Sequence, residues 1–419
     1  MAFDASLAVL MAAKYCKQYP LFRWREEVLP EIGRREEKLC CRVDLTNLLQ
    51  DQGQEMLMTL FPAQLSFVDF QKENTLYKLK ALMVTMKHPY ILPVVDIYYS
   101  KGKKGVLVVQ PFIATGSLKD RINRSDPSRP YKEKYRLYHA SPLEFHEVAR
   151  FGRQILEALN ALRSKGVVCD HLSTGNIVID QGNARIADIY IPLLAIDRHK
   201  DSRELTVSLE ARVDVDVLLF GRVLYEMATG MELTTPIPAD DVLELLPPEI
   251  ADVLDLIFYQ SKPATDDREA ILSIDDESAS IISDGSGSSN GDKSIVDTLL
   301  ECALFTGATD VPPIKTLFSG FRFDSGMKST IRHSMRINAS RNHAYVVQYK
   351  EKEALIRARQ RAERRVHDER EKNEKRAQQV AVARVQSSTQ NKAPSSRRKT
   401  YRANSFRSPL DRQPSAASA

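Results

Sequence analysis

The chain has 419 residues, of which 43% are hydrophobic and 27% are charged, and its formal net charge is +5. This composition excludes a chain that is disordered throughout, because enough apolar residues are present to bury a core. Its five cysteines show no CxxC spacing, which argues against a zinc site or a redox pair. No run of 18 apolar residues exists, so the sequence predicts neither a membrane span nor a secretory signal, and we expect a cytoplasmic protein.

The first predicted elements are rich in β-structure. Residues 1–39 have weak helical character, and we set them apart as an N-terminal extension without an assigned function. From residue 40 the runs "LCCRVDL" and "EMLMTLF" are typical of strands, and "FQKENTLYKLKALMVTMKH" has the apolar spacing of a helix that ends before Pro89. Two strands around a "KGKKG" turn then predict a hairpin.

Helices dominate the next part of the chain. The segment "SPLEFHEVARFGRQILEALNALRSKG" predicts a helix with Ser141 as its N-cap and Gly166 at its end. Residues 213–230 predict a second, strongly apolar helix, and further helices are expected near 240–260 and 294–305.

Three segments have biased compositions. Residues 261–294 are acidic and serine-rich, which predicts a disordered surface insert. Residues 321–385 predict a charged helical segment, and 386–419 a disordered basic tail. From Arg384 to Arg412 there are eight basic residues and one acidic residue. Acid–base pairs four residues apart support the charged helix: Glu353 with Arg357, Asp368 with Lys372, and Glu371 with Lys375.

The stretch "VVCDHLSTGNIVIDQGNARIADIY" at residues 167–190 carries the most chemistry. Together with "HPYIL", "GSLKD" and "DVLLFGRVLYEMATG" it makes residues 40–320 resemble the protein kinase fold, which implies an α+β, bilobal domain with a small β-rich lobe and a helical lobe. The chain is most similar to the pseudokinase-like group of PX-domain-containing kinase-like proteins and the slowpoke-binding protein. Because only about 40 residues precede the domain, we expect the slowpoke-binding branch rather than one with a lipid-binding PX domain.

The resemblance places altered residues at the catalytic positions. Aligned on Asn176, the kinase His-Arg-Asp triplet falls on residues 169–171, so His171 replaces the general base and Ser173 replaces the loop lysine. Loss of a positioned base costs about 10² to 10⁴ in rate, which predicts little or no kinase turnover. A slipped alignment on Asp170 would restore a carboxylate but break the fixed offset to Asn176, and His171 could itself act as a base.

The metal positions are better preserved than the nucleotide positions. Asn176 and Asp188 fall where kinases hold Mg²⁺ on ATP, although both could instead be loop hydrogen-bonders. The only glycine near the expected phosphate loop is Gly53, and "EMLMTLF" contains no lysine. Leu79 occupies the position of the ion-pair glutamate, with Glu73 or Lys72 as substitutes if the register differs. We therefore expect no required cofactor and at most weak binding of Mg-ATP.

Two residues of the apolar helix at 213–230 are expected to have structural roles. The resemblance implies that Asp216 ties the catalytic loop to this helix, where an ordinary N-cap is the simpler interpretation, and Gly221 follows it five residues later. The segment between Asp188 and Glu210 is short and contains no Ala-Pro-Glu sequence, so the usual platform for a substrate peptide is not expected.

The tail offers candidate regulatory sites at Thr400, Ser405 and Ser408, which resemble basophilic and proline-directed phosphorylation sites. Phosphate among arginines could create a docking motif for 14-3-3 proteins. In the acidic insert, Ser273 and Ser289 have the pattern of acidophilic sites, and a solvated loop is the favoured interpretation there.

These observations favour a scaffold or adaptor over an enzyme. The resemblance implies a protein that modulates a calcium-activated potassium channel and binds 14-3-3 proteins, with recruitment to the plasma membrane. The basic tail could contact anionic lipid, whereas nucleic acid is not expected because few aromatic residues interleave the basic ones. The alternatives are an atypical low-activity kinase that binds Mg-ATP through Asn176 and Asp188, and a folded spacer for the charged helix.

Overall fold

The computed structural model divides the chain into two compact units, Met1–Tyr349 and Lys350–Ala419. The residues that the structure describes are 5–29, 38–47, 50–72, 74–102, 104–135, 140–210, 212–260, 294–308, 311 and 320–390.

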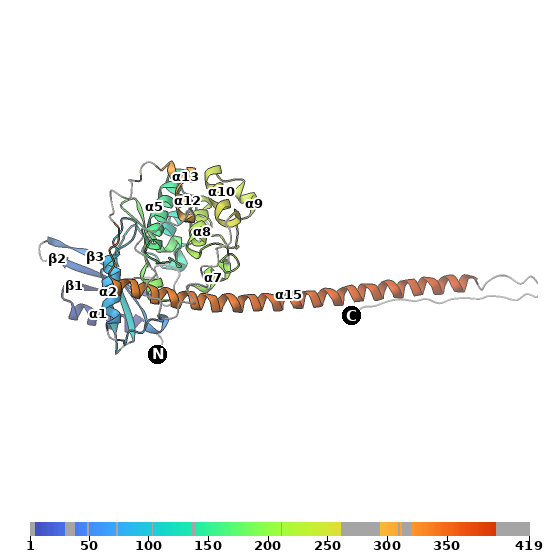
Figure 1. Ribbon diagram of the computed structural model, residues 1–419, viewed down its shortest axis with the longest axis horizontal. Coiled ribbons are helices and arrows are strands. Elements are labelled where there is room, and N and C mark those ends of the chain that lie inside the picture. Colours follow the sequence, from blue (N-terminus) through green and yellow to red (C-terminus); the bar gives the residue numbers. More distant parts are fainter. Residues whose placement is uncertain are drawn as a thin grey trace, which may run out of the picture. The chain divides into compact units, whose positions relative to one another are not determined.

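The N-terminal lobe is built on a five-stranded antiparallel sheet with the order β1, β2, β3, β5, β4 (Figure 1). The strands are β1 (Phe22–Leu29), β2 (Leu39–Asn47), β3 (Gln50–Pro62), β4 (Asp96–Ser100) and β5 (Gly105–Pro111). Side chains alternate between the faces of a strand, so Met58 and Leu60 of β3 enter one apolar cluster and Phe61 enters another. The predicted hairpin of β4 and β5 is confirmed.

Helix α1 (Ala5–Gln18) covers one face of this sheet and buries Met11 and Tyr15 against β3. Strand β1 pairs with β2, from Phe22 opposite Leu45 onward. Residues 5–29, set apart above as an extension, are therefore part of the packed first unit, because they supply both an edge strand and its apolar cover.

Helix α2 (Thr75–Thr85) packs beside the sheet through Leu79, Leu82 and Met83, which are fully buried. Its Lys80 forms an ion pair with Asp96 of β4, at 2.7 Å between Nζ and Oδ1. The Tyr15 hydroxyl donates to the other oxygen of Asp96 at 2.5 Å. A single buried carboxylate thus connects α1, α2 and the sheet.

The second lobe is helical, as predicted, and the bilobal α+β fold class is confirmed. Its elements are α3 (Leu118–Asn123), α4 (Tyr131–Lys134), α5 (Phe145–Arg163), β6 (Ile177–Asp180), β7 (Asn183–Ile186), α6 (Tyr190–Leu193), α7 (Lys200–Thr206), α8 (Val215–Thr229), α9 (Asp240–Leu243), α10 (Pro248–Asp255), α12 (Ile295–Leu300) and α13 (Ala303–Thr306).

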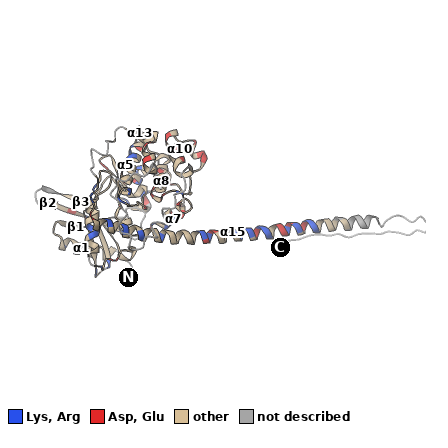
Figure 2. Ribbon diagram, in the orientation of Figure 1, with Lys and Arg blue, Asp and Glu red and all other residues tan. Residues whose placement is uncertain are grey.

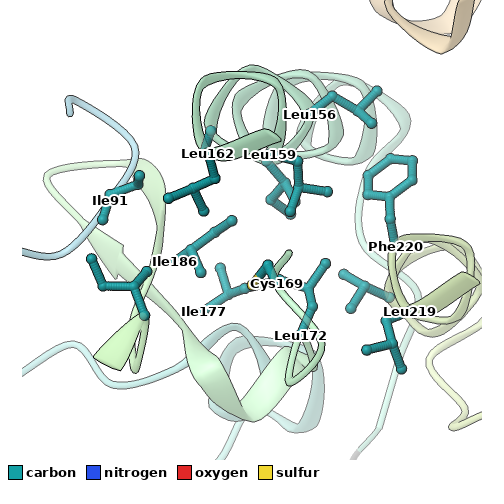
Figure 3. Close-up of a cluster of buried hydrophobic side chains, with 14 of the residues drawn as sticks. Ile91, Leu156, Leu159, Leu162, Cys169, Leu172, Ile177, Ile186, Leu219 and Phe220 are labelled. Atoms are coloured by element: carbon teal, nitrogen blue, oxygen red, sulfur yellow. The ribbon is translucent and has the colours of Figure 1, made fainter. Parts of the chain in front are cut away.

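Helices α5 and α8 line the core of this lobe. Leu156 of α5 lies toward Phe220 of α8, whereas Leu162 lies toward Ile186 of the hairpin of β6 and β7, and all belong to one buried cluster (Figure 3). A Cβ atom on Gly221 would lie 2.9 Å from the Phe258 ring, which explains a glycine in the middle of a buried helix.

Helix α5 begins at Phe145 rather than at the predicted Ser141. Gly230, with φ of 74°, approaches so closely that its Cβ position would lie 2.7 Å from the carbonyl carbon of Ser141. The chain before Phe145 follows the end of α8 instead of turning into a helix, since Leu143 donates its backbone N–H to Met227.

The chain returns to described structure at Ser294, whose hydroxyl caps α12, so the predicted insert lies outside the described residues except at this position. The charged segment is confirmed as helix α15 (Ser325–Gln390), and it carries both signs of charge beyond Lys350 (Figure 2). Two of the predicted pairs form there, Glu353 with Arg357 and Glu371 with Lys375. Within the described residues, no helix combines the length and apolar character needed to cross a membrane.

His88 generates a prediction about stability and pH. Its Nδ1 accepts the backbone N–H of Tyr90 at 3.1 Å, and burial lowers its pKa from 6.5 to about 4. Protonation would turn this acceptor into a donor, so stability is complete above pH 6.5 and falls as the pH drops toward 4. At about 1.4 kcal/mol per pH unit, this single group is expected to remove about 3 kcal/mol.

Urea unfolding at several pH values checks this expectation. The matched control is His88→Asn, which keeps a side-chain acceptor for the Tyr90 N–H but does not titrate. The stability difference between the two proteins should shrink as the pH falls from 6.5 to 4, and parallel curves would contradict the assignment.

Candidate functional site

The catalytic loop, residues 167–176, is held between the end of α5 and the hairpin of β6 and β7. The side chains of Cys169 and Leu172 are buried in the hydrophobic cluster of the second lobe, and they anchor the loop to this cluster (Figure 3). Asn176 accepts the backbone N–H of Ala187 at 2.8 Å, which fixes the loop to the residue before Asp188. The predicted residues His171, Asn176 and Asp188 therefore lie on one connected framework.

The His171 ring is nearly buried, and both of its nitrogens have partners. Nδ1 lies 2.6 Å from Oδ1 of Asp170, and Nε2 lies 3.1 Å from the carbonyl oxygen of Asp197. Both partners are acceptors, so a ring nitrogen that bonds its partner does so as a donor and is not free to take a proton from a substrate. This geometry is that of a structural cross-link between the catalytic loop and the following segment.

Asp170 acts as the counter-ion of His171. Burial alone would raise the pKa of the Asp170 carboxyl, but the charge and hydrogen bond of His171, with the Arg198 charge, hold it below the usual range. The carboxylate that a slipped alignment would use as a base is thus committed to the neighbouring imidazole.

Asn176 is held by its own loop. Its Nδ2 donates to the carbonyl oxygen of His171 at 2.6 Å, which orients the amide and leaves its Oδ1 as the atom able to face a ligand. This geometry fits both interpretations of Asn176. Its Nδ2 acts as a loop hydrogen-bonder, and its Oδ1 is an oxygen of the kind that binds Mg²⁺.

Asp188 is buried and has a left-handed backbone with φ of 58°, a conformation uncommon for a residue other than glycine. Its Oδ2 lies 2.8 Å from Nζ of Lys38, and the two side chains are 8% and 13% exposed. An ammonium group therefore stands against the carboxylate expected to hold Mg²⁺. Among the described residues, no cluster of three or more His, Cys, Asp or Glu side chains forms a metal site.

The position of the ion-pair glutamate is filled by a neutral side chain, Leu79, which is fully buried in α2. Strand β3 contains no lysine, and its Thr59 is buried with the hydroxyl 3.9 Å from the Cys40 thiol. Lys72 is exposed, and Glu73 lies outside the described residues. Gly53 lies inside β3 rather than in a loop, and the segment between β1 and β2, residues 30–37, also lies outside the described part.

A small cavity of about 110 Å³ lies next to the catalytic loop, and Ser173 lines it. Three of its charged groups pair with one another, since Lys119 lies 3.4 Å from Glu226 and 3.0 Å from Glu232. The Thr174 hydroxyl also donates to Glu226 at 2.7 Å. Burial raises the pKa of Glu226, although the Lys119 charge opposes this. Ser173 itself is exposed at the rim and gives the loop no positive charge.

Asp216 is fully buried at the start of α8, where Arg163 of α5 binds it at 2.6 Å. Arg163 also binds Asp214 at 2.6 Å, so one guanidinium joins the two helices through two carboxylates. Burial raises the pKa of Asp216, and the Arg163 charge opposes this. The expected hydrogen bonds from the catalytic loop to Asp216 are not found within the described residues. Besides Arg163, the partner of Asp216 there is the backbone N–H of Val217.

The first part of α15 lies on the activation segment, residues 189–210. Ser334 donates to the carbonyl oxygen of Leu193 at 2.6 Å, and Asn338 donates to that of Pro192 at 2.9 Å. The Arg203 guanidinium stacks over the Tyr345 ring at 4.7 Å. Sequence reasoning expected a charged helix here but gave no signal that its first turns are a docking element.

A buried polar cluster completes this contact. Arg198 and Glu210 form an ion pair at 2.7 Å with 4% and 1% of their side chains exposed. Asn342 of α15 bonds both, accepting from Arg198 and donating to Glu210 at 2.7 Å each. Burial opposes the ionisation of Glu210, but Arg198 and these hydrogen bonds hold its pKa below the usual range.

The predicted regulatory residues Thr400, Ser405 and Ser408 lie outside the described residues, as do Ser273 and Ser289.

The fold and the altered site define a pseudokinase, a kinase-like domain whose catalytic positions carry other residues. A family model described as protein tyrosine and serine/threonine kinase matches residues 67–249. The predicted resemblance is confirmed: the proteins that this chain is similar to include the slowpoke-binding protein and the PX domain-containing kinase-like protein.

The chain is similar to several named proteins, of which one carries a name that describes an inactive kinase. The slowpoke-binding protein of Drosophila melanogaster is 35% identical over 221 residues, 52% of this chain and 42% of that protein. The probable inactive serine/threonine-protein kinase slob2 of Dictyostelium discoideum is 30% identical over 60% of this chain and 43% of that protein. The PX domain-containing protein kinase-like protein of Mus musculus is 30% identical over 49% and 34%. The chain thus spans less than half the length of each of these relatives.

Restoring a carboxylate by His171→Asp is expected to destabilise the domain without creating a kinase. The new carboxylate would lie beside Asp170 and lose both contacts of the ring, at a cost of about 1–3 kcal/mol. The loop lysine would still be missing and Asp188 would still be paired with Lys38. Urea unfolding and transfer of labelled phosphate from ATP measure the two effects, and turnover above the wild-type background would contradict this account.

Asn342→Ala tests the contact of α15 with the activation segment. Loss of the amide removes one hydrogen bond from each member of a buried ion pair, so we expect a loss of about 1–3 kcal/mol in unfolding free energy. The matched control is His343→Ala, whose side chain is exposed on the same turn. Equal stability of the two variants would show that the cluster does not hold the helix.

Proposed function

We propose that this protein is a catalytically impaired pseudokinase that acts as a scaffold or adaptor for a membrane-protein partner. The observation that carries the proposal is the double engagement of His171, whose two ring nitrogens contact Asp170 and the Asp197 carbonyl. A group at the base position that holds two segments together is not available to accept a proton from a substrate.

The packing of α15 on the activation segment supports the same conclusion. In a kinase this region supports the substrate peptide, whereas here the side chains of α15 hold the carbonyl groups of Pro192 and Leu193. A partner protein would therefore bind surfaces other than a peptide groove at the catalytic loop. The function would depend on the folded shape of the domain and on its appended segments, because fold alone does not imply chemistry.

The proposed partner is a calcium-activated potassium channel, an expectation that rests on the family and on the name of the slowpoke-binding relative. Recruitment from the cytoplasm to the plasma membrane would follow from that contact. The basic tail would add regulation, through phosphorylation at Thr400, Ser405 or Ser408, through 14-3-3 proteins, or through contact with anionic lipid.

The second candidate is an atypical kinase of low activity that binds Mg-ATP through Asn176 and Asp188. The observation that favours it is the oriented amide of Asn176, with Oδ1 available, on the same framework as Asp188. We propose instead that the domain requires no cofactor, because its fixed charges already have partners within the chain.

A binding assay with the purified chain and the cytoplasmic part of a calcium-activated potassium channel tests the adaptor function. Saturable binding that is unchanged by ATP and by Ser173→Ala, a change at the exposed loop-lysine position, is expected, since catalysis is not involved. A second assay measures 14-3-3 binding by the chain before and after phosphorylation at Ser405, with Ser405→Ala as the control.

The outcomes separate the candidates. No channel binding under either condition would remove the proposed partner, whereas binding together with transfer of phosphate from Mg-ATP would favour the atypical kinase. Equal, negligible 14-3-3 binding by both tail forms would remove the phosphorylation switch at Ser405.

A further inference from the structure

The ion pair between Lys38 and Asp188 joins the two lobes at the position where a nucleotide-bound metal would be expected. Lys38 directly precedes β2 in the first lobe, and Asp188 follows β7 in the second. Their charged atoms are 2.8 Å apart, and little of either side chain reaches solvent. A buried pair of this kind persists only when each charge is compensated by the other.

Among the described residues, the Cys40 thiol of β2 lies near this ion pair. Burial keeps the pKa of the thiol above the usual range, so the thiol stays uncharged. The Thr59 hydroxyl is the closest partner given for that thiol. Among the described residues, Asp188 is the carboxylate with which Lys38 forms an ion pair.

The backbone on both sides of Asp188 is held by hydrogen bonds. With φ of 58° at Asp188, the Ile191 N–H donates to the Asp188 carbonyl at 2.9 Å, and the Ala187 N–H donates to the Asn176 carbonyl just before it. The side chain of Asp188 therefore starts from a fixed point beside the catalytic loop.

A divalent cation does not fit beside this pair. Mg²⁺ needs oxygen ligands at about 2.0–2.1 Å in a near-octahedral arrangement, usually with several waters. An ammonium group 2.8 Å from the same carboxylate takes the space of those waters and repels a second cation at short range.

We infer that Lys38 replaces the divalent cation at Asp188, so that the space between the lobes holds a fixed positive charge and takes up no Mg²⁺. Lys38 is then a positioning residue that joins the lobes. The cation belongs to the chain and does not depend on a ligand. The inference concerns this site alone and does not depend on the partner proposed above.

Metal binding to the full chain tests the inference, with Mn²⁺ alone as the probe and its electron paramagnetic resonance signal as the readout. Wild-type protein should not bind Mn²⁺ at Asp188 at millimolar concentrations of the metal. Lys38→Met removes the charge but keeps an unbranched side chain, and should tighten Mn²⁺ binding by at least about tenfold. Adding Asp188→Asn to Lys38→Met should abolish the gain, and Lys38→Arg, which keeps the charge, should behave like the wild type.

A thermal shift gives a second readout that needs no Lys38 variant. The melting temperature of wild-type protein with millimolar ATP should be the same in Mg²⁺ and in EDTA. A shift that requires Mg²⁺ and disappears in Asp188→Asn would overturn the inference, as would Mn²⁺ binding by the wild type that Asp188→Asn removes. Failure of a folded Lys38→Met protein to gain Mn²⁺ would show that the ammonium does not exclude the metal.

Discussion

The arrangement of the site depends on Asp197, which connects three parts of the chain. Its carbonyl oxygen contacts Nε2 of His171, and its carboxylate binds Arg203 of α7 and Arg341 of α15. The catalytic loop, the activation segment and the C-terminal helix therefore meet at one residue. Since the next residue, Arg198, forms the buried pair with Glu210 that Asn342 completes, movement of α15 would disturb the loop as well.

The charged groups that could do chemistry are used to hold the fold together. His171 is paired with Asp170, Asp188 with Lys38, and Glu226 with Lys119. Active sites usually keep charges poised for a substrate, with strongly perturbed groups facing a cleft. Here each of these charges is paired with a side chain of the same protein. The pairing offsets the desolvation cost of burying the charge.

Much of the architecture could be predicted because it depends on local patterns. The patterns of residues 141–166 and 213–230 indicated two helices, and two strand-like runs around a turn indicated the hairpin of β4 and β5. The start of α5 was wrong, because the close approach of Gly230 to Ser141 is a tertiary contact. The role of residues 5–29 was missed for the same reason, since an edge strand and its cover are defined by what they pack against.

The sequence by itself determined which residues replace the catalytic ones, because residue identities at fixed spacing around Asn176 need no coordinates. Only the tertiary structure decided what those residues contact. Lys38 stands in an ordinary charged run, 150 residues before Asp188, and nothing local marks it as the partner of that carboxylate. Likewise, Asn342 in a long polar helix gives no sign that it bonds a buried ion pair. Such pairings are set by the packing of the lobes and of α15, which bring together residues that are far apart in the chain.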